Sequence, residues 1–240
     1  MADLKTQARP ISSSGVDDLS IDQGLRAYMI SVYQYMMLGV GVTGMAAYLT
    51  HATPALYNAI HGSPLGLVVM FAPLAIVWFV FGKIGSMSAS RAQTWFWVFA
   101  SVMGLSMAYI FRRYVEADIV RVFFITSATF GALSLYGYTT PRSLSAWGSF
   151  LFMGLAGVIL ASIVNIFMAS SAVTFAVSLL GVLIFAGLTA YDTQKIKELY
   201  LAEDDAETVS KKAIYGALEL YLDFINLFLL LLRLLGSNRN

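Results

Sequence analysis

Two acidic side chains stand out because each belongs to a long apolar segment in the last quarter of the chain. Asp192 lies at the end of one apolar run, and Asp223 lies well inside the next one. Ionisable residues within membrane-spanning segments are costly to bury, so they are candidates for function by default. The chemistry open to two such carboxyl groups is the binding of a proton or of a cation.

Asp223 belongs to a stripe of polar residues on one helical face. Tyr215, Glu219, Asp223 and Asn226 are spaced by four, four and three residues, which places their side chains along one side of a helix. Counted from Ala213, Asp223 lies roughly 15 Å into the membrane at 1.5 Å per residue. A side chain this short cannot reach water from that depth, so the stripe must face other helices or a water-filled path.

A single loop joins the segments that carry Asp192 and Asp223, so the two helices are expected to be antiparallel neighbours. Carboxyl groups that meet in a low-dielectric space tend to share one proton. Such a pair would act as a proton-sensitive latch or as a cation-binding point. Spacing alone leaves open whether Glu219 or Asp223 pairs with Asp192. The alternative without function is that Asp192 caps or packs its helix and Asp223 bonds Asn226.

The segments that position these acids dominate the composition. Of 240 residues, 58% are hydrophobic and 12% are Asp, Glu, Lys or Arg, with a mean hydropathy of +0.73. Soluble domains carry about 25% charged residues, and a span needs about 20 apolar residues. Apolar runs this long favour helices over barrel strands. We therefore predict an all-α integral membrane protein with a seven-transmembrane-helix bundle. Its expected surroundings are the lipid bilayer. The expected spans are residues 28–49, 65–81, 95–111, 119–136, 147–166, 173–190 and 213–235.

Charge distribution divides the chain and orients it. Residues 1–26 are predicted to be a polar mobile arm that ends in a short interfacial helix at 21–26, followed by the transmembrane domain at 27–236 and a short polar tail at 237–240. With the N-terminus inside, ten Lys and Arg residues fall on the cytoplasmic side and five outside. This bias predicts a multi-pass protein of the cell (inner, plasma) membrane with a cytoplasmic N-terminus and an external C-terminus.

Several function classes do not fit the sequence. It has no Cys, its two His residues (His51 and His61) fall in one loop, and no basic face could bind nucleic acid. An intramembrane aspartyl protease would carry Gly-x-Gly-Asp, whereas Leu-Tyr-Leu precedes Asp223. We therefore expect no enzyme activity, no nucleic-acid partner and no cofactor other than transient Ca²⁺ and protons.

Two sequence blocks around the acids resemble the signature of a known family. Residues 187–196 read GLTAYDTQKI and residues 217–228 read ALELYLDFINLF, which is similar to the Bax inhibitor-one (transmembrane Bax inhibitor motif) family in its bacterial branch. The resemblance implies a seven-helix fold and a pH-regulated calcium leak, with Asp192 and Asp223 as the pH-sensing pair. It also implies a basic latch residue in the second span, for which Lys83 is the candidate here.

The stripe and the resemblance together predict a weak, transient Ca²⁺ site at Asp192 and Asp223. Tight Ca²⁺ binding needs six to eight oxygen ligands, and the stripe supplies too few for a closed cage, which suits passage of an ion. Protonation of the pair should lower cation occupancy and close the path, so we expect modulation between about pH 6 and 8. A proton-coupled secondary transporter, or a protein that regulates unknown membrane-protein partners without ion flux, remains the alternative.

Overall fold

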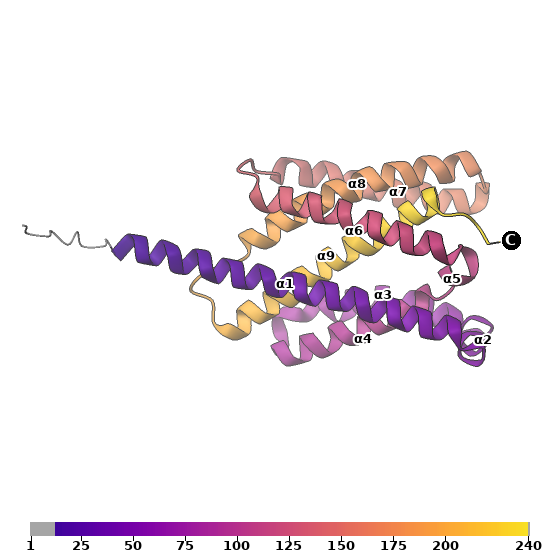
Figure 1. Cartoon of the computed structure of the whole chain (residues 1–240), viewed down its shortest axis with the longest axis horizontal. Coiled ribbons are helices and arrows are strands. Elements are labelled where there is room, and N and C mark those ends of the chain that lie inside the picture. Colours follow the sequence, from indigo (N-terminus) through magenta and orange to yellow (C-terminus); the bar gives the residue numbers. More distant parts are fainter. Residues whose placement is uncertain (1–12, 240) are drawn as a thin grey trace, which may run out of the picture.

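The chain folds into a bundle of helices (Figure 1), and the computed structural model describes residues 13–239, with side chains from Gln23 onward. Within this described range there is no β-strand, and the β-structure is limited to an isolated bridge between Tyr114 and Asn238. The elements in chain order are α1 (Ser13–Ala52), α2 (Pro54–His61), α3 (Leu65–Phe79), the 3₁₀ helix η1 (Phe81–Ser86), α4 (Ala89–Met107), α5 (Ile110–Arg113), α6 (Glu116–Thr139), α7 (Ser145–Met168), α8 (Ser171–Glu198) and α9 (Ala206–Leu235).

Five helical segments of the described chain are long and apolar enough to cross a membrane. They are Leu65–Ser86, Ala89–Arg113, Glu116–Thr139, Ser145–Met168 and Ser171–Glu198. The all-helical membrane class is therefore confirmed, whereas the count of seven spans is not. The predicted first and last spans do lie in the long helices α1 and α9. Glu219, Asp223 and Arg233 fall within residues 213–235 of α9, the predicted last span.

The N-terminal region differs from the expectation of a mobile arm with a separate short helix at 21–26. Helix α1 begins at Ser13, so residues 13–26 continue the first long helix without a break. No proline occurs between Pro10 and Pro54, so nothing in this stretch removes a helical hydrogen bond. Residues 1–12 of the predicted arm, and Asn240 of the predicted tail, lie outside the described residues.

Helix α9 lies at the centre of the bundle. Figure 1 shows it running between a group formed by α1, α3 and α4 and a group formed by α6, α7 and α8, and it contacts α1, α4, α6 and α8. Its side chains Leu220, Tyr221 and Leu227 are fully buried. Helix α7 lies at the periphery against α8, and large apolar side chains such as Phe150 and Phe167 are exposed on its outer face. The acids of α9 therefore face protein, and α7 presents an apolar surface suited to lipid.

Gly137 allows α6 and α8 to approach closely. A Cβ atom added at Gly137 would lie 2.2 Å from the carbonyl oxygen of Ala190, which is backbone and cannot rotate away. Gly131 lies on the same helix, and a Cβ atom added there would meet nothing within 4 Å.

Replacing Gly137 with alanine is expected to destabilise the protein by about 1–3 kcal/mol, because α6 and α8 would have to move apart. The matched substitution Gly131→Ala should change stability by about 0.5 kcal/mol or less. Thermal unfolding of the two purified variants in the same detergent measures the difference. Equal stability of the two variants would contradict the close approach of α6 and α8.

Candidate functional site

The elements that carry the two acids are joined by the short segment between Glu198 and Ala206. Asp205 caps the start of α9, where its Oδ1 accepts a hydrogen bond from the backbone N–H of Thr208 at 2.6 Å. This hydrogen bond holds the pKa of Asp205 below its usual range. Side chains at such N-terminal positions satisfy free backbone N–H groups, so the starting point of α9 is well specified.

Helices α8 and α9 pack closely along the segment that carries the acids. A Cβ atom added at Gly216 would lie 2.8 Å from Cγ2 of Ile196, and the Ile196 side chain is fully buried. Because Gly216 has no side chain, the two backbones come near enough for short acidic side chains to span the gap. The expectation that these helices are antiparallel neighbours is met.

The structure brings Asp192 and Asp223 together. The two side chains lie within hydrogen-bonding reach of each other and are 7% and 4% exposed. Ionised carboxylates only accept hydrogen bonds, so a hydrogen bond between these two groups requires a proton on one of them. The second oxygen of Asp223, Oδ2, is buried without a hydrogen-bond partner. The pair therefore retains an unused oxygen that could accept a further proton or contact a cation.

Glu219 pairs with Lys195 and not with Asp192, the partner that the spacing had left open. Nζ of Lys195 donates to Oε1 of Glu219 at 2.7 Å, while Oε2 of Glu219 is buried without a hydrogen-bond partner. This ion pair lies about one helical turn from the acid pair on both α8 and α9. Three acids and one base thus form a cluster, and with one proton on the acid pair its net charge is −1. A cluster of this charge attracts cations.

The other residues predicted on the polar stripe of α9 are Tyr215 and Asn226. Tyr215 lies beside Glu219. Asn226 donates from Nδ2 to the backbone oxygen of Leu222 at 2.8 Å, so its amide bonds its own helix. The alternative in which Asn226 bonds Asp223 is therefore not seen among the hydrogen bonds of the described residues.

Lys83 is exposed on η1 and forms no ion pair with any described residue. Its latch role therefore stays a prediction, because no contact links it to the acids. The basic side chain in the acid cluster is Lys195, which was not identified as a site residue from the sequence. Its spacing of three residues from Asp192 was the available signal.

A chain of hydroxyl groups next to Asp192 was also missed in the sequence. The Tyr33 hydroxyl bonds Oγ of Ser134 at 2.7 Å, and Ser134 bonds Oγ1 of Thr193 at 2.8 Å. Thr193 in turn donates to the backbone oxygen of Thr189 at 2.7 Å. These contacts join α1, α6 and α8 at the residue that follows Asp192. Hydroxyl residues are common in membrane helices, so only their contacts reveal this chain.

The acids do not form a closed metal site. Among the described residues, no group of three or more His, Asp or Glu side chains could hold a metal ion. Ca²⁺ bound at Asp192 and Asp223 would thus keep most of its hydration shell, since it prefers six to eight oxygen ligands.

Replacing Lys195 with methionine is expected to destabilise the protein by about 1–3 kcal/mol, because it leaves the carboxylate of Glu219 without its charged partner. The second substitution Glu219→Gln in the same chain should recover most of the loss, since the unpaired charge is then removed. A double-mutant cycle of thermal unfolding measures this coupling. Strictly additive effects of the two substitutions would show that the ion pair contributes nothing.

Comparison with known proteins places the chain in a family. The sequence model described as Inhibitor of apoptosis-promoting Bax1 (Bax1-I) matches residues 25–240. An uncharacterized protein of Rickettsia prowazekii is 47% identical over 221 residues, which cover 92% of this chain and 94% of the relative. The inner membrane protein YbhL of Escherichia coli K12 is 42% identical over 219 residues, covering 90% and 94% of the two chains.

A more distant relative extends the same similarity. An uncharacterized membrane protein of Streptococcus pyogenes is 32% identical over 221 residues, which cover 90% of this chain and 95% of the relative. The family match includes both sequence blocks and all of the helices from α2 to α9. The chain is therefore a membrane protein of the Bax1-I (Bax inhibitor-1) family.

Proposed function

We propose that this protein is a pH-sensitive calcium leak channel gated by Asp192 and Asp223. The observation that carries the proposal is that these two side chains lie together, buried between α8 and the central helix α9. Family membership and the net negative charge of the neighbouring cluster support it further. Lys195 and Glu219 are the other charged groups that face the pair.

The proposed mechanism follows from how many protons the acid pair holds. With one shared proton, a short charge-assisted hydrogen bond holds α8 against α9 and keeps the path closed. When that proton leaves, Asp192 and Asp223 repel each other, so the helices separate and both carboxylates face the path. A hydrated Ca²⁺ ion then replaces the proton as the counter-charge. Weak binding allows the ion to leave again.

Purified protein in liposomes tests this function directly. Ca²⁺ flux, followed with an enclosed fluorescent indicator, is expected to be low near pH 6 and to rise toward pH 8, with equal pH on both sides. Protein-free liposomes provide the baseline. Flux that appears only when the pH differs across the membrane would favour a proton-coupled secondary transporter. No flux at any pH would favour a regulatory protein that acts through membrane partners.

We also infer seven crossings in the inner membrane, with the N-terminus in the cytoplasm and the C-terminus outside. The excess of Lys and Arg on one side supports this orientation, and the similarity to the inner membrane protein YbhL supports the location. The C-terminal residues pair with the segment before α6, where Val115 donates to Ser237 at 3.1 Å and Arg239 donates to Arg113 at 2.8 Å. These contacts agree with the assignment of both segments to one side.

A reporter enzyme that works only outside the cytoplasm is expected to be active when it is fused after Asn240. The same reporter inserted in the segment 199–205 between α8 and α9 should be silent, because that segment is assigned to the cytoplasm. A reporter that works only in the cytoplasm should give the reverse pattern. Cytoplasmic activity of the fusion after Asn240 would overturn the proposed topology.

A further inference from the structure

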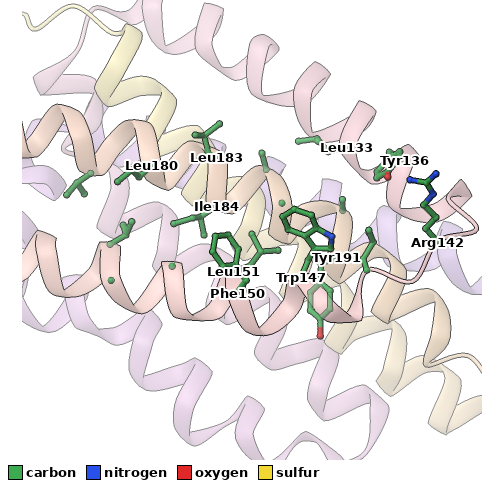
Figure 2. Close-up of a pocket in the computed structure, with 18 of the residues that line it drawn as sticks. Leu133, Tyr136, Arg142, Trp147, Phe150, Leu151, Leu180, Leu183, Ile184 and Tyr191 are labelled. Atoms are coloured by element: carbon green, nitrogen blue, oxygen red, sulfur yellow. The ribbon is translucent and has the colours of Figure 1, made fainter.

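An apolar groove runs along the outer side of the bundle between α6, α7 and α8, with a volume of about 860 Å³ (Figure 2). Leu180, Leu183 and Phe150 line it and are exposed. Arg142 lies at one end near Tyr136, with Trp147 farther along the groove. No acidic side chain is among the residues that line it. The groove is therefore apolar along its length and basic at one end.

The groove is long enough to hold a lipid acyl chain. From Trp147 to Ala161 along α7 it runs roughly 21 Å at 1.5 Å per residue. One leaflet of a bilayer contributes about half of the 30 Å hydrocarbon thickness, roughly 15 Å, so an acyl chain of one leaflet fits within this length. The groove is open beside Gly157, because a Cβ atom added there would meet nothing within 4 Å. An acyl chain can lie here in contact with α7 and α8.

The basic end is held in place by a side chain of α8. Gln194 donates from Nε2 to the backbone oxygen of Arg142 at 3.0 Å, and its Oε1 accepts from the backbone N–H of Leu144 at 2.7 Å. The Arg142 side chain is exposed and forms no ion pair with any described residue. A guanidinium group binds phosphate oxygens in a bidentate manner, and Trp and Tyr favour the headgroup level of a bilayer.

We propose that this groove binds one anionic glycerophospholipid from the leaflet on the Arg142 side. Its acyl chain lies between α7 and α8, and its phosphate contacts Arg142. Charge complementarity supports this occupant, since the groove carries one positive side chain and no negative one. Tyr191 lines the groove and Asp192 follows it directly in α8, so the groove reaches the turn of α8 that carries Asp192. Lipid binding here does not depend on whether the protein conducts Ca²⁺.

Quenching of Trp147 fluorescence by brominated lipids tests the site. The variant carries Trp147 as its sole tryptophan, with Trp78, Trp95 and Trp97 replaced by phenylalanine, and is reconstituted in phosphatidylcholine vesicles. Bromines near the carboxyl end of the acyl chain are placed either on phosphatidylglycerol or on phosphatidylcholine. Because one Arg contacts the anionic headgroup, brominated phosphatidylglycerol should reach half-quenching at a mole fraction about fivefold lower than that of brominated phosphatidylcholine.

Two substitutions separate a specific site from ordinary lipid contact. Arg142→Gln should abolish the preference for phosphatidylglycerol, and Gly157→Leu should reduce quenching by both lipids because it fills the groove. Gly131→Leu is the matched control, since Gly131 lines a different groove, between α1 and α6, and also has open space at its Cβ position. Equal half-quenching by the two lipids, or an unchanged preference in Arg142→Gln, would overturn the proposal.

Lipid carried through purification gives a second measurement on the natural sequence. After detergent washing, mass spectrometry of the intact protein should find bound phosphatidylglycerol on the parent chain. The Arg142→Gln variant should retain about fivefold less, in line with the loss of one basic contact. Equal retention by the two chains would reject the site even if the sole-tryptophan variant does not fold.

Discussion

Replacing Asp223 with asparagine is expected to abolish the pH dependence of Ca²⁺ flux and to weaken Ca²⁺ binding. In the parent, one proton titrates on the acid pair, so flux should rise about tenfold between about pH 6 and 8. Asparagine cannot lose that proton, and it replaces a buried carboxylate oxygen that has no other partner. The variant's flux should therefore be the same at every pH in the liposome assay.

Asp205→Asn is the matched control for this substitution. Asp205 precedes α9 and accepts a hydrogen bond from Thr208, which an asparagine side chain can also accept. This variant keeps the start of α9 and should retain the parent's rise in flux with pH. If Asp223→Asn also retains that rise, the acid pair is not the pH sensor.

Replacing Asp192 with asparagine is expected to leave the protein folded but unable to close in acid. The amide group can still donate a hydrogen bond to the carboxylate of Asp223, so no buried acceptor loses its partner. That bond is weaker than a hydrogen bond shared between two carboxyl groups and does not depend on a titrating proton. Flux near pH 6 should therefore approach the level that the parent reaches near pH 8.

Thermal unfolding of Asp192→Asn, measured beside the flux, shows whether the variant remains folded. We expect its unfolding temperature to stay within a few degrees of the parent, since the change in stability should be about 1 kcal/mol or less. A folded variant whose flux still falls in acid as the parent's does would refute the latch. Low flux at every pH would show that Asp192 is needed to open the path.

Much of the fold follows from the local sequence. A segment that faces lipid must be apolar over its whole length and must satisfy its own backbone hydrogen bonds, so each span is a continuous apolar run. Five of the seven expected segments accordingly lie within one long helix each, whereas residues 65–81 run from α3 into η1 and residues 95–111 run from α4 into α5. The antiparallel contact of α8 and α9 follows from the short connection between them. The start of α1 was missed because its first turns are polar, and polarity alone does not distinguish a helix from a mobile arm.

The pairing of the acids could not be predicted without knowing how the helices pack. Helical spacing places Glu219 and Asp223 on one face of α9, but it does not say how far α8 is shifted along that face. The structure supplies this offset, which joins Asp192 to Asp223 and Lys195 to Glu219. The hydroxyl chain from Tyr33 to Thr193 likewise depends on three helices meeting. Helix formation is a property of neighbours along the chain, whereas the pairing of side chains depends on how α8 and α9 pack, which close contacts such as Gly216 with Ile196 decide.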